Sequence, residues 1–223
     1  MPHIKPRLPG RRCGGAGANV VCYGTRDSQE AEPWRGHNCS IFLSDIVAFG
    51  WHDRNDVDRK VVRDEMYANL RDAFESSDVP WWSCHREDRG DGALIVIPPN
   101  IPTRAVVYPL LDLLASALKR HNRQSTKATR MQLRVALNVG PVISDPRGVS
   151  GEAIIRAARL IDAPMLKKEL ARSAADLGVI VSTFIYDSVI KHAPGQVDSA
   201  QYRQLRFRVK ESRLTAWMYL AGG

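Results

Sequence analysis

Two aspartates occupy positions from which their carboxylates could take part in chemistry. Asp45 interrupts the apolar run at residues 41–49, and Asp91 lies in the acidic, glycine-containing turn at residues 87–92. Mg²⁺ prefers a few carboxylate oxygens together with the phosphates of a substrate, and a pair of such ions activates a hydroxyl while neutralising a leaving group. If a sheet brings Asp45 and Asp91 side by side, the pair predicts a magnesium site for phosphoryl transfer.

The surrounding pattern predicts elements that would position these acids. Residues 41–49 are typical of a buried strand, and residues 80–86 and 93–97 of two hairpin strands whose turn holds Asp91. Residues 56–74 carry apolar side chains mostly four apart, the spacing of an amphipathic helix. Residues 131–139 alternate apolar and polar side chains, which predicts a strand that Gly140 and Pro141 stop.

The remaining pattern completes the predicted order of elements. We expect helices at 103–121, 150–162, 164–174 and 184–191, and strands at 179–182, 202–210 and 214–220. Pro109 should delay or kink the first of these helices, Ser150 should cap the second, and Pro164 should begin the third. The order βαββαβ with further elements predicts an α/β (α+β) fold, a ferredoxin-like core with additional C-terminal strands.

Length, charge and cysteine spacing narrow the class of protein. A chain of 223 residues fits one domain, expected at 38–223 behind a flexible Gly, Pro and Arg-rich leader at 1–37. Without a membrane-length apolar run or a signal peptide, we expect a cytoplasmic protein with no membrane partner. The Lys and Arg residues behind the net charge of +8 are scattered among acids, so an anionic small-molecule substrate explains the charge as well as nucleic acid does. The cysteines lack CxxC spacing, which predicts reduced thiols: Cys13, Cys22, Cys39 and Cys84.

Four segments resemble the class III adenylyl and guanylyl cyclases, in the order of that family. FLSDIVAF at 42–49 resembles the first metal-binding strand, and GDG at 90–92 the second metal hairpin. LRVALNVGPV at 133–142 is similar to the strand that ends in Gly-Pro, and GEAIIRAARL at 151–160 to the helix that ends in Ala-Arg-Leu. The resemblance covers residues 38–165 by motif and the rest by element order.

The resemblance implies an activity and a set of roles. A class III cyclase converts a nucleoside triphosphate to a 3′,5′-cyclic nucleotide and pyrophosphate, by attack of the 3′-hydroxyl on the α-phosphorus. By that likeness, Asp45, Asp91 and the backbone carbonyl of Ile46 would hold two Mg²⁺ or Mn²⁺ ions, and Arg159 would stabilise charge on the α-phosphate. Family sites lie between the subunits of a head-to-tail dimer, so the resemblance implies a homodimer with shared active sites.

The chain departs from the family at the substrate-reading positions. Ile155 falls where the family has an asparagine, and Gly148 falls where a purine-reading residue is expected, with Asp145 three positions early. Glu87 stands where adenylyl cyclases usually carry Lys and guanylyl cyclases Glu, which leans towards guanine. The divergent bacterial cyclases that make cyclic UMP or cyclic CMP in antiphage defence are the other branch, so the base stays open. Arg156 shares a helix face with Arg159 and is a substitute phosphate contact.

Each residue also has a structural explanation. The structural explanation of Asp45 is a strand-end acid that caps a helix or pairs with an arginine, and that of Asp91 is a turn former. Arg159 is read in the same way as a helix residue that pairs with Asp162. For the whole protein, Ile155 favours a second interpretation, a cyclase-like module that has lost turnover and serves in nucleotide sensing or dimerisation.

A third interpretation is a nucleic-acid-binding sheet, suggested by the charge and by the pair Trp81-Trp82. Adjacent residues of a strand point to opposite faces, so at least one tryptophan should pack in the core. The basic residues Arg206, Arg208 and Lys210 alternate with apolar ones, which predicts the solvent face of a strand.

Overall fold

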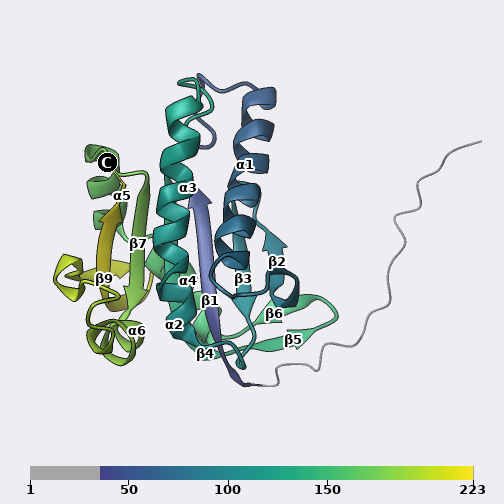
Figure 1. The fold of residues 1–223 in the computed structure, drawn as a ribbon. Helices are drawn as coiled ribbons and strands as arrows, with labels where there is room; N and C mark the ends of the chain where they lie inside the picture. Colours follow the sequence, from purple (N-terminus) through teal and green to yellow (C-terminus); the bar gives the residue numbers. More distant parts are fainter. Residues whose placement is uncertain (1–35, 223) are drawn as a thin grey trace, which may run out of the picture. The chain divides into compact units, whose positions relative to one another are not determined.

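A computed structural model describes residues 36–222, which form a seven-stranded sheet with helices and a separate two-stranded hairpin (Figure 1). The main sheet has the order β2-β3-β1-β4-β7-β9-β8, and the hairpin pairs β5 with β6. The strands are β1 (Asn38–Ile46), β2 (His85–Asp88), β3 (Gly92–Ile97), β4 (Leu133–Pro141), β5 (Ile143–Asp145), β6 (Gly148–Ser150), β7 (Leu177–Ser182), β8 (Arg203–Val209) and β9 (Ser212–Ala221). The helices are α1 (Asp56–Glu75), α2 (Thr103–Val107), α3 (Leu110–Gln124), α4 (Glu152–Ile161), α5 (Pro164–Arg172) and α6 (Thr183–Ser188), with short 3₁₀ turns η1 (Trp81–Ser83), η2 (Ile190–His192) and η3 (Ser199–Gln201).

The predicted fold class is confirmed. The strands β2-β3-β1-β4 form the ferredoxin-like half of the sheet, with β1 central and antiparallel to both β3 and β4. The strands β7, β9 and β8 extend this half, and β7 runs parallel to β4. Most of the expected leader, with Cys13 and Cys22, lies outside the described residues. Within the described part of the chain, no helix is long and apolar enough to cross a bilayer.

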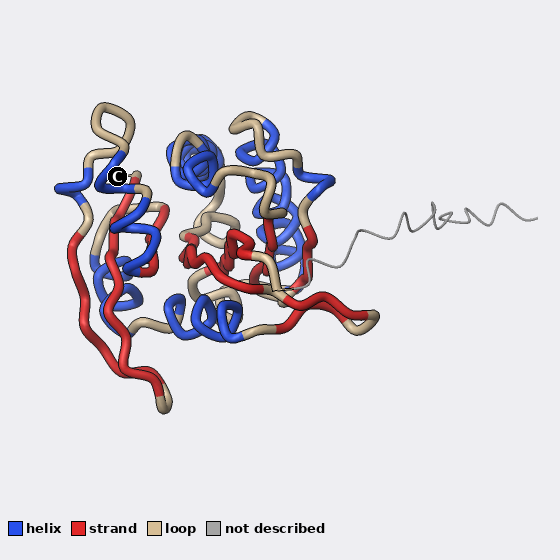
Figure 2. Tube along the Cα trace, turned by 90° about the horizontal axis from the view of Figure 1, so that it is seen from below, coloured by secondary structure: helices blue, strands red, loops and turns tan. Residues whose placement is uncertain are grey.

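The sheet is covered by helices on both faces, as the view along its edge shows (Figure 2). On β1, the side chain of Phe42 packs edge-on against Phe74 of α1, with ring centroids 5.3 Å apart. Ile41 shares a different buried cluster with Ala157 of α4. Because side chains alternate along a strand, Asp45 lies on the same face as Ile41, under α4 and not under α1.

Helix α1 begins and packs as its sequence predicts. The side chain of Asn55 accepts a hydrogen bond from the Asp58 backbone at 2.9 Å, and the Asp58 carboxylate accepts one from the Asn55 backbone at 3.1 Å. This capping box satisfies two of the backbone N–H groups that a helix start leaves unpaired. The buried stripe of Val62, Met66 and Leu70 follows the predicted four-residue spacing and holds the helix on the sheet.

The expected strand at 80–86 is wrong at its start. Residues 81–83 form the 3₁₀ turn η1, in which the Ser83 N–H donates to the Pro80 carbonyl at 3.1 Å. Trp81 is buried against Phe74, with ring centroids 5.4 Å apart, whereas Trp82 is exposed. The split of the pair between core and solvent was predicted, but a turn produces it instead of a strand. Strand β2 therefore starts at His85 and includes residues 87 and 88, which were expected in the turn.

Other predicted elements also differ from the structure, and β4 runs through Gly140 and Pro141, which were expected to stop it. The expected helix at 103–121 is two helices, α2 and α3, because the chain is interrupted at Tyr108 and Pro109. Helix α4 is capped by Gly151, not by Ser150, and Gly151 has φ 140°, a conformation that other residues rarely adopt. The hairpin β5–β6 was not predicted, since three residues per strand are too few to show a period.

Candidate active site

The register of the central strands brings Asp45 and Asp91 together. Asp45 is paired with Gly92 across the β1–β3 ladder, and the Ile46 N–H donates a hydrogen bond to the Asp91 carbonyl at 2.7 Å. Two acids 46 positions apart in the sequence are thus neighbours at the end of β1. This juxtaposition is the one that the sequence required for a metal site.

Gly92 allows the two strands to approach this closely. A Cβ atom at position 92 would lie 1.9 Å from the Ser44 carbonyl oxygen and 2.8 Å from the Asp45 Cα. Real Cβ atoms do not approach backbone atoms to such distances, so the strand start requires a residue without a side chain. The glycine after Asp91 therefore seats the hairpin against β1.

Asp45 makes a two-pronged ion pair with Arg134 of β4. The Arg134 Nε donates to Asp45 Oδ1 at 2.7 Å and the Nη2 to Oδ2 at 2.5 Å, and the two residues face each other in the β1–β4 register. The exposed fractions of these side chains are 19% for Asp45 and 13% for Arg134. The arginine pairing proposed as a structural explanation of Asp45 is therefore present. Sequence reasoning missed Arg134, although it is a polar member of the alternating pattern in β4.

Burial dominates the electrostatics of Asp45. Loss of water raises its pKa to about 6, although the adjacent Arg134 acts to lower it. The negative charge of Asp91 adds to the rise, and the positive charge of Lys167 on α5 opposes it. A cation bound beside Asp45 would favour its ionised form, as nearby positive charge does for any carboxylate.

Arg159 lies away from the two aspartates. Its Nη2 donates to the Glu211 carboxylate, in the turn between β8 and β9, at 2.8 Å. Its Nε is buried and has no hydrogen-bond partner among the described residues. The pairing with Asp162 expected from the sequence is wrong, because Asp162 follows the last residue of α4 and accepts a hydrogen bond from Lys167 at 2.6 Å.

The two positions that the resemblance assigned to base recognition lie in contact. Glu87 accepts hydrogen bonds from the Val149 backbone at 3.2 Å, His85 Nε2 at 3.0 Å and Arg89 Nη2 at 2.6 Å. A Cβ at Gly148 would lie 2.7 Å from Glu87 Oε1. Partial burial acts to raise the pKa of Glu87, but these partners outweigh it and hold the pKa below its usual value. Glu87 is thus an ionised group against the β5–β6 hairpin.

The donor set fits a hard divalent cation that is completed by substrate. Within residues 36–222, no group of three or more His, Cys, Asp or Glu side chains is placed to hold a metal. Asp45 and Asp91 would supply oxygen ligands, the type that Mg²⁺ and Mn²⁺ prefer. Mg²⁺ is commonly held by one or two carboxylates plus phosphate oxygens, so this pair suits an ion that arrives with a nucleotide.

Comparison with known proteins locates this arrangement in a known fold. No family model and no curated protein matches the sequence. Among solved structures, the guanylyl cyclase Cya2 matches with a TM-score of 0.59 and 16% identity, over 84% of this chain and 93% of that chain. The chain has the fold of a nucleotidyl cyclase catalytic domain. An adenylate/guanylate cyclase/hydrolase from Silicibacter pomeroyi matches with a TM-score of 0.58 and 16% identity, covering 82% of this chain and 96% of that one.

A nucleotide complex is among these matches. The guanylate cyclase domain of RhGC from Catenaria anguillulae, in complex with GTP, has a TM-score of 0.53 and 16% identity, over 86% of this chain and 99% of that chain. The predicted likeness to class III cyclases is confirmed at the level of the fold.

Within this cyclase fold, Asp88 clamps the β2–β3 hairpin, which carries Asp91, to α1. Its carboxylate accepts hydrogen bonds from Arg63, from the Tyr67 hydroxyl at 3.1 Å and from the Gly90 backbone at 3.0 Å. Partial burial acts to raise the pKa of Asp88, but these hydrogen bonds outweigh it and hold the pKa below its ordinary value. The clamp fixes the approach of the chain to Asp91.

Asp88→Asn should lower the free energy of unfolding by about 1 kcal/mol near neutral pH, because charge-assisted hydrogen bonds to α1 are lost. Since the folded pKa lies below the unfolded one, the contribution is present above the unfolded pKa and is lost as pH falls through the folded value. Urea unfolding near pH 7 measures the loss of stability, and urea unfolding near pH 3 measures how far that loss disappears in acid. A difference between variant and wild type that stays the same at both pH values would contradict this account.

Proposed function

We propose that this protein is a metal-dependent nucleotidyl cyclase, which converts a nucleoside triphosphate to a 3′,5′-cyclic nucleotide and pyrophosphate. The observation that carries the proposal is the β1–β3 register, which seats Asp91 beside Asp45 on a cyclase fold. Two Mg²⁺ or Mn²⁺ ions, when bound, would neutralise the triphosphate and activate the 3′-hydroxyl. Residues 38–223 would form the catalytic domain, with the carbonyl of Ile46 as a further metal ligand.

Arg134 is a second phosphate-binding group in this proposal. Its guanidinium is mostly buried and already placed by Asp45 at the site where the phosphates would lie. Because its Nε and Nη2 already donate to the Asp45 carboxylate, Arg134 would bind a phosphate oxygen through its remaining nitrogen, Nη1. Lys167, whose charge acts on Asp45, adds positive potential from α5. Both groups would draw an anionic substrate to the aspartates.

The site would be completed by a second copy of the chain. Arg159 is bound to Glu211 in the turn between β8 and β9, whereas Asp45 lies on β1, between β3 and β4 in the strand order. Exposed apolar side chains at Ile143 of β5 and Ile155 of α4, with exposed fractions of 55% and 46%, support burial against another protein surface. In a homodimer with shared sites, Arg159 and Arg156 of one subunit would serve the aspartates of the other.

Arg159→Lys should lower kcat by about a hundredfold, because a single ammonium cannot replace a fork directed at the transferring phosphate. The melting temperature should change little, since the ion pair with exposed Glu211 contributes little to stability. Steady-state kinetics with the best triphosphate, and thermal unfolding, measure the two effects. Arg156→Lys, on the same helix but exposed, is the matched control and should have the smaller effect.

Mixing two inactive variants tests the shared site. Asp91→Asn removes a metal ligand and Arg159→Ala removes the arginine. Neither homodimer therefore contains an intact site. Random exchange of subunits makes half of the dimers mixed, each with one intact site, so activity should return to about a quarter of the wild-type value. Activity that stays at the level of the separate variants, although subunit exchange is shown by differently tagged chains, would refute sharing.

Fewer residues bear on which base the substrate carries and on which pathway uses the product. The ionised Glu87 is suited to accept hydrogen bonds from the N1 and amino groups of guanine, if His85 and Arg89 release it. Its contact with glycine at 148 leaves no second side chain there, which also suits a pyrimidine triphosphate. Product formation would serve second-messenger signalling, and a pyrimidine product would favour the antiphage branch. Ile155, exposed and unable to orient a ribose, supports the second candidate, a nucleotide-sensing or dimerisation module without turnover.

A further inference from the structure

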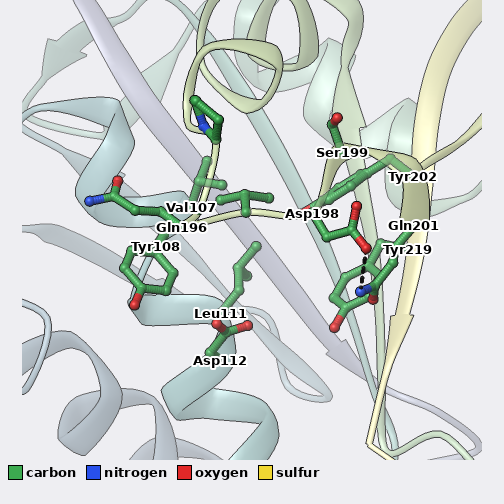
Figure 3. Close-up of a pocket in the computed structure, with 13 residues that line it drawn as sticks. Val107, Tyr108, Leu111, Asp112, Gln196, Asp198, Ser199, Gln201, Tyr202 and Tyr219 are labelled. Atoms are coloured by element: carbon green, nitrogen blue, oxygen red, sulfur yellow. Dashed lines mark hydrogen bonds between the residues drawn. The ribbon is translucent and has the colours of Figure 1, made fainter.

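A cavity of about 620 Å³ lies between the junction of α2 and α3, the segment at 194–202 and β9 (Figure 3). Its volume is typical of pockets for small molecules. Figure 3 shows Tyr108 on one side of the cavity and Asp198, Tyr202 and Tyr219 on the other, with Asp112 at the base. None of these residues has a role in the proposed nucleotide site.

The sheet separates this cavity from the two aspartates. Tyr219 packs against the large core cluster that lies under α1 and α3, whereas its neighbour Met218 belongs to the cluster on the α4 and α5 face. Asp45 lies on that second face. A ligand in the cavity would therefore occupy a site distinct from the nucleotide.

The cavity is negatively charged in a chain whose net charge is +8. Its lining contains Asp112 and Asp198 but no Lys, Arg or His among the described residues. Asp198 accepts hydrogen bonds from the Ala200 backbone and Gln201 Nε2, both at 3.0 Å. Asp112 has no hydrogen bond or ion pair to any residue within 36–222, and partial burial raises its pKa. The carboxylates lack a positive partner, and a cation would supply one.

The walls of the cavity are aromatic. The rings of Tyr202 and Tyr219 are stacked with centroids 5.2 Å apart. Tyr202 lines the cavity and is 6% exposed as a residue, and its hydroxyl makes no hydrogen bond within the described part of the chain. Aromatic faces attract cations, and a hydroxyl on the cavity wall can form a hydrogen bond with a polar group of a ligand. Apolar Val107 and Leu111 complete the lining, so a bare metal ion would be poorly held.

We propose that this cavity binds a small organic cation, in which a protonated amine or guanidinium lies near Asp112 and Asp198 and an apolar body packs against Tyr202 and Tyr219. The amine donates hydrogen bonds to the carboxylates and to the tyrosine hydroxyl. The apolar body fills the space over Val107 and Leu111. The inference does not depend on the cyclase proposal, because it concerns a different face of the sheet.

Isothermal titration calorimetry with phenethylamine, agmatine and the neutral isostere 2-phenylethanol tests the proposal on the full chain. The two cations should bind, phenethylamine at least about tenfold more tightly than the alcohol. Asp112→Asn should weaken phenethylamine binding about tenfold and leave the alcohol unchanged. Asp72→Asn, which removes an exposed carboxylate on α1 outside the cavity, is the matched control and should not change either affinity.

Three results would overturn the proposal. The first is that neither cation binds at concentrations up to about 10 mM, a weak limit for a ligand of this size. The amine and the alcohol bind with equal affinity, which would show that charge plays no part. Asp112→Asn and Asp72→Asn change phenethylamine binding equally, which would show a general charge effect. Circular dichroism of each variant confirms that a lost affinity does not reflect a lost fold.

Discussion

Asp91→Asn should lower cyclase turnover at least about a hundredfold while leaving the fold intact, because a metal ligand is lost from an exposed side chain. Asparagine keeps the shape of the side chain and its place in the turn, so the backbone contact with Ile46 is preserved. It removes the negative charge that attracts a divalent cation. Turnover with Mn²⁺ and the melting temperature, measured on the same preparation, separate the chemical effect from the structural one.

Asp64→Asn is the control for this prediction, since it removes an exposed carboxylate on α1 that pairs with Lys60. It should leave turnover unchanged. Asp45→Asn should abolish turnover too, but it should also destabilise the fold, because it leaves the buried Arg134 without its ionic partner. If Asp91→Asn keeps more than a tenth of wild-type turnover, the assignment of Asp91 as a metal ligand is contradicted.

Gly92→Ala should lower the free energy of unfolding by at least about 3 kcal/mol and abolish turnover with it. The new Cβ meets the Ser44 carbonyl oxygen at 1.9 Å and the Asp45 Cα at 2.8 Å, and these backbone atoms belong to the central strand. Neither can move without opening the β1–β3 ladder. Urea denaturation gives the change in stability, and no rearrangement of a flexible side chain is available to reduce it.

Gly90→Ala is the matched control, because it lies two positions away in the same turn. Gly90 has φ 83°, so alanine is strained there, but nothing lies within 4 Å of the added Cβ. A loss of about 1 kcal/mol is expected. If Gly92→Ala is no less stable than Gly90→Ala, the close approach of the two strands is not what fixes the hairpin.

The strong periodic signals in the sequence predicted most of the fold. The alternation at 131–139 and the four-residue spacing at 56–74 correspond to β4 and α1, since each pattern has one face to bury. The predictions failed at local exceptions to these patterns, where a tertiary contact or a backbone conformation decides the structure. Trp81 looked like a strand residue but forms a turn against Phe74, and the start of α4 is set by the backbone of Gly151.

The candidate site was predictable as residue types but not as contacts. Asp45 was singled out because it interrupts an apolar strand, and Asp91 because it lies in a hairpin turn that a sheet could bring beside Asp45; the register makes them neighbours. The pairing of Asp45 with Arg134 depends on which residues face each other across β1 and β4, which one sequence does not specify. The same is true of Arg159, whose partner Glu211 is 52 positions away.

The most direct test of the cyclase proposal is mass spectrometry of the products from ATP, GTP, CTP and UTP, each incubated with the purified protein and Mn²⁺. The account predicts that at least one triphosphate yields its 3′,5′-cyclic monophosphate and an equal amount of pyrophosphate, and that Asp91→Asn and EDTA both abolish the product. If no triphosphate is cyclised by folded protein, the cyclase proposal is contradicted, and a nucleotide-sensing or dimerisation module becomes the better account of the same fold.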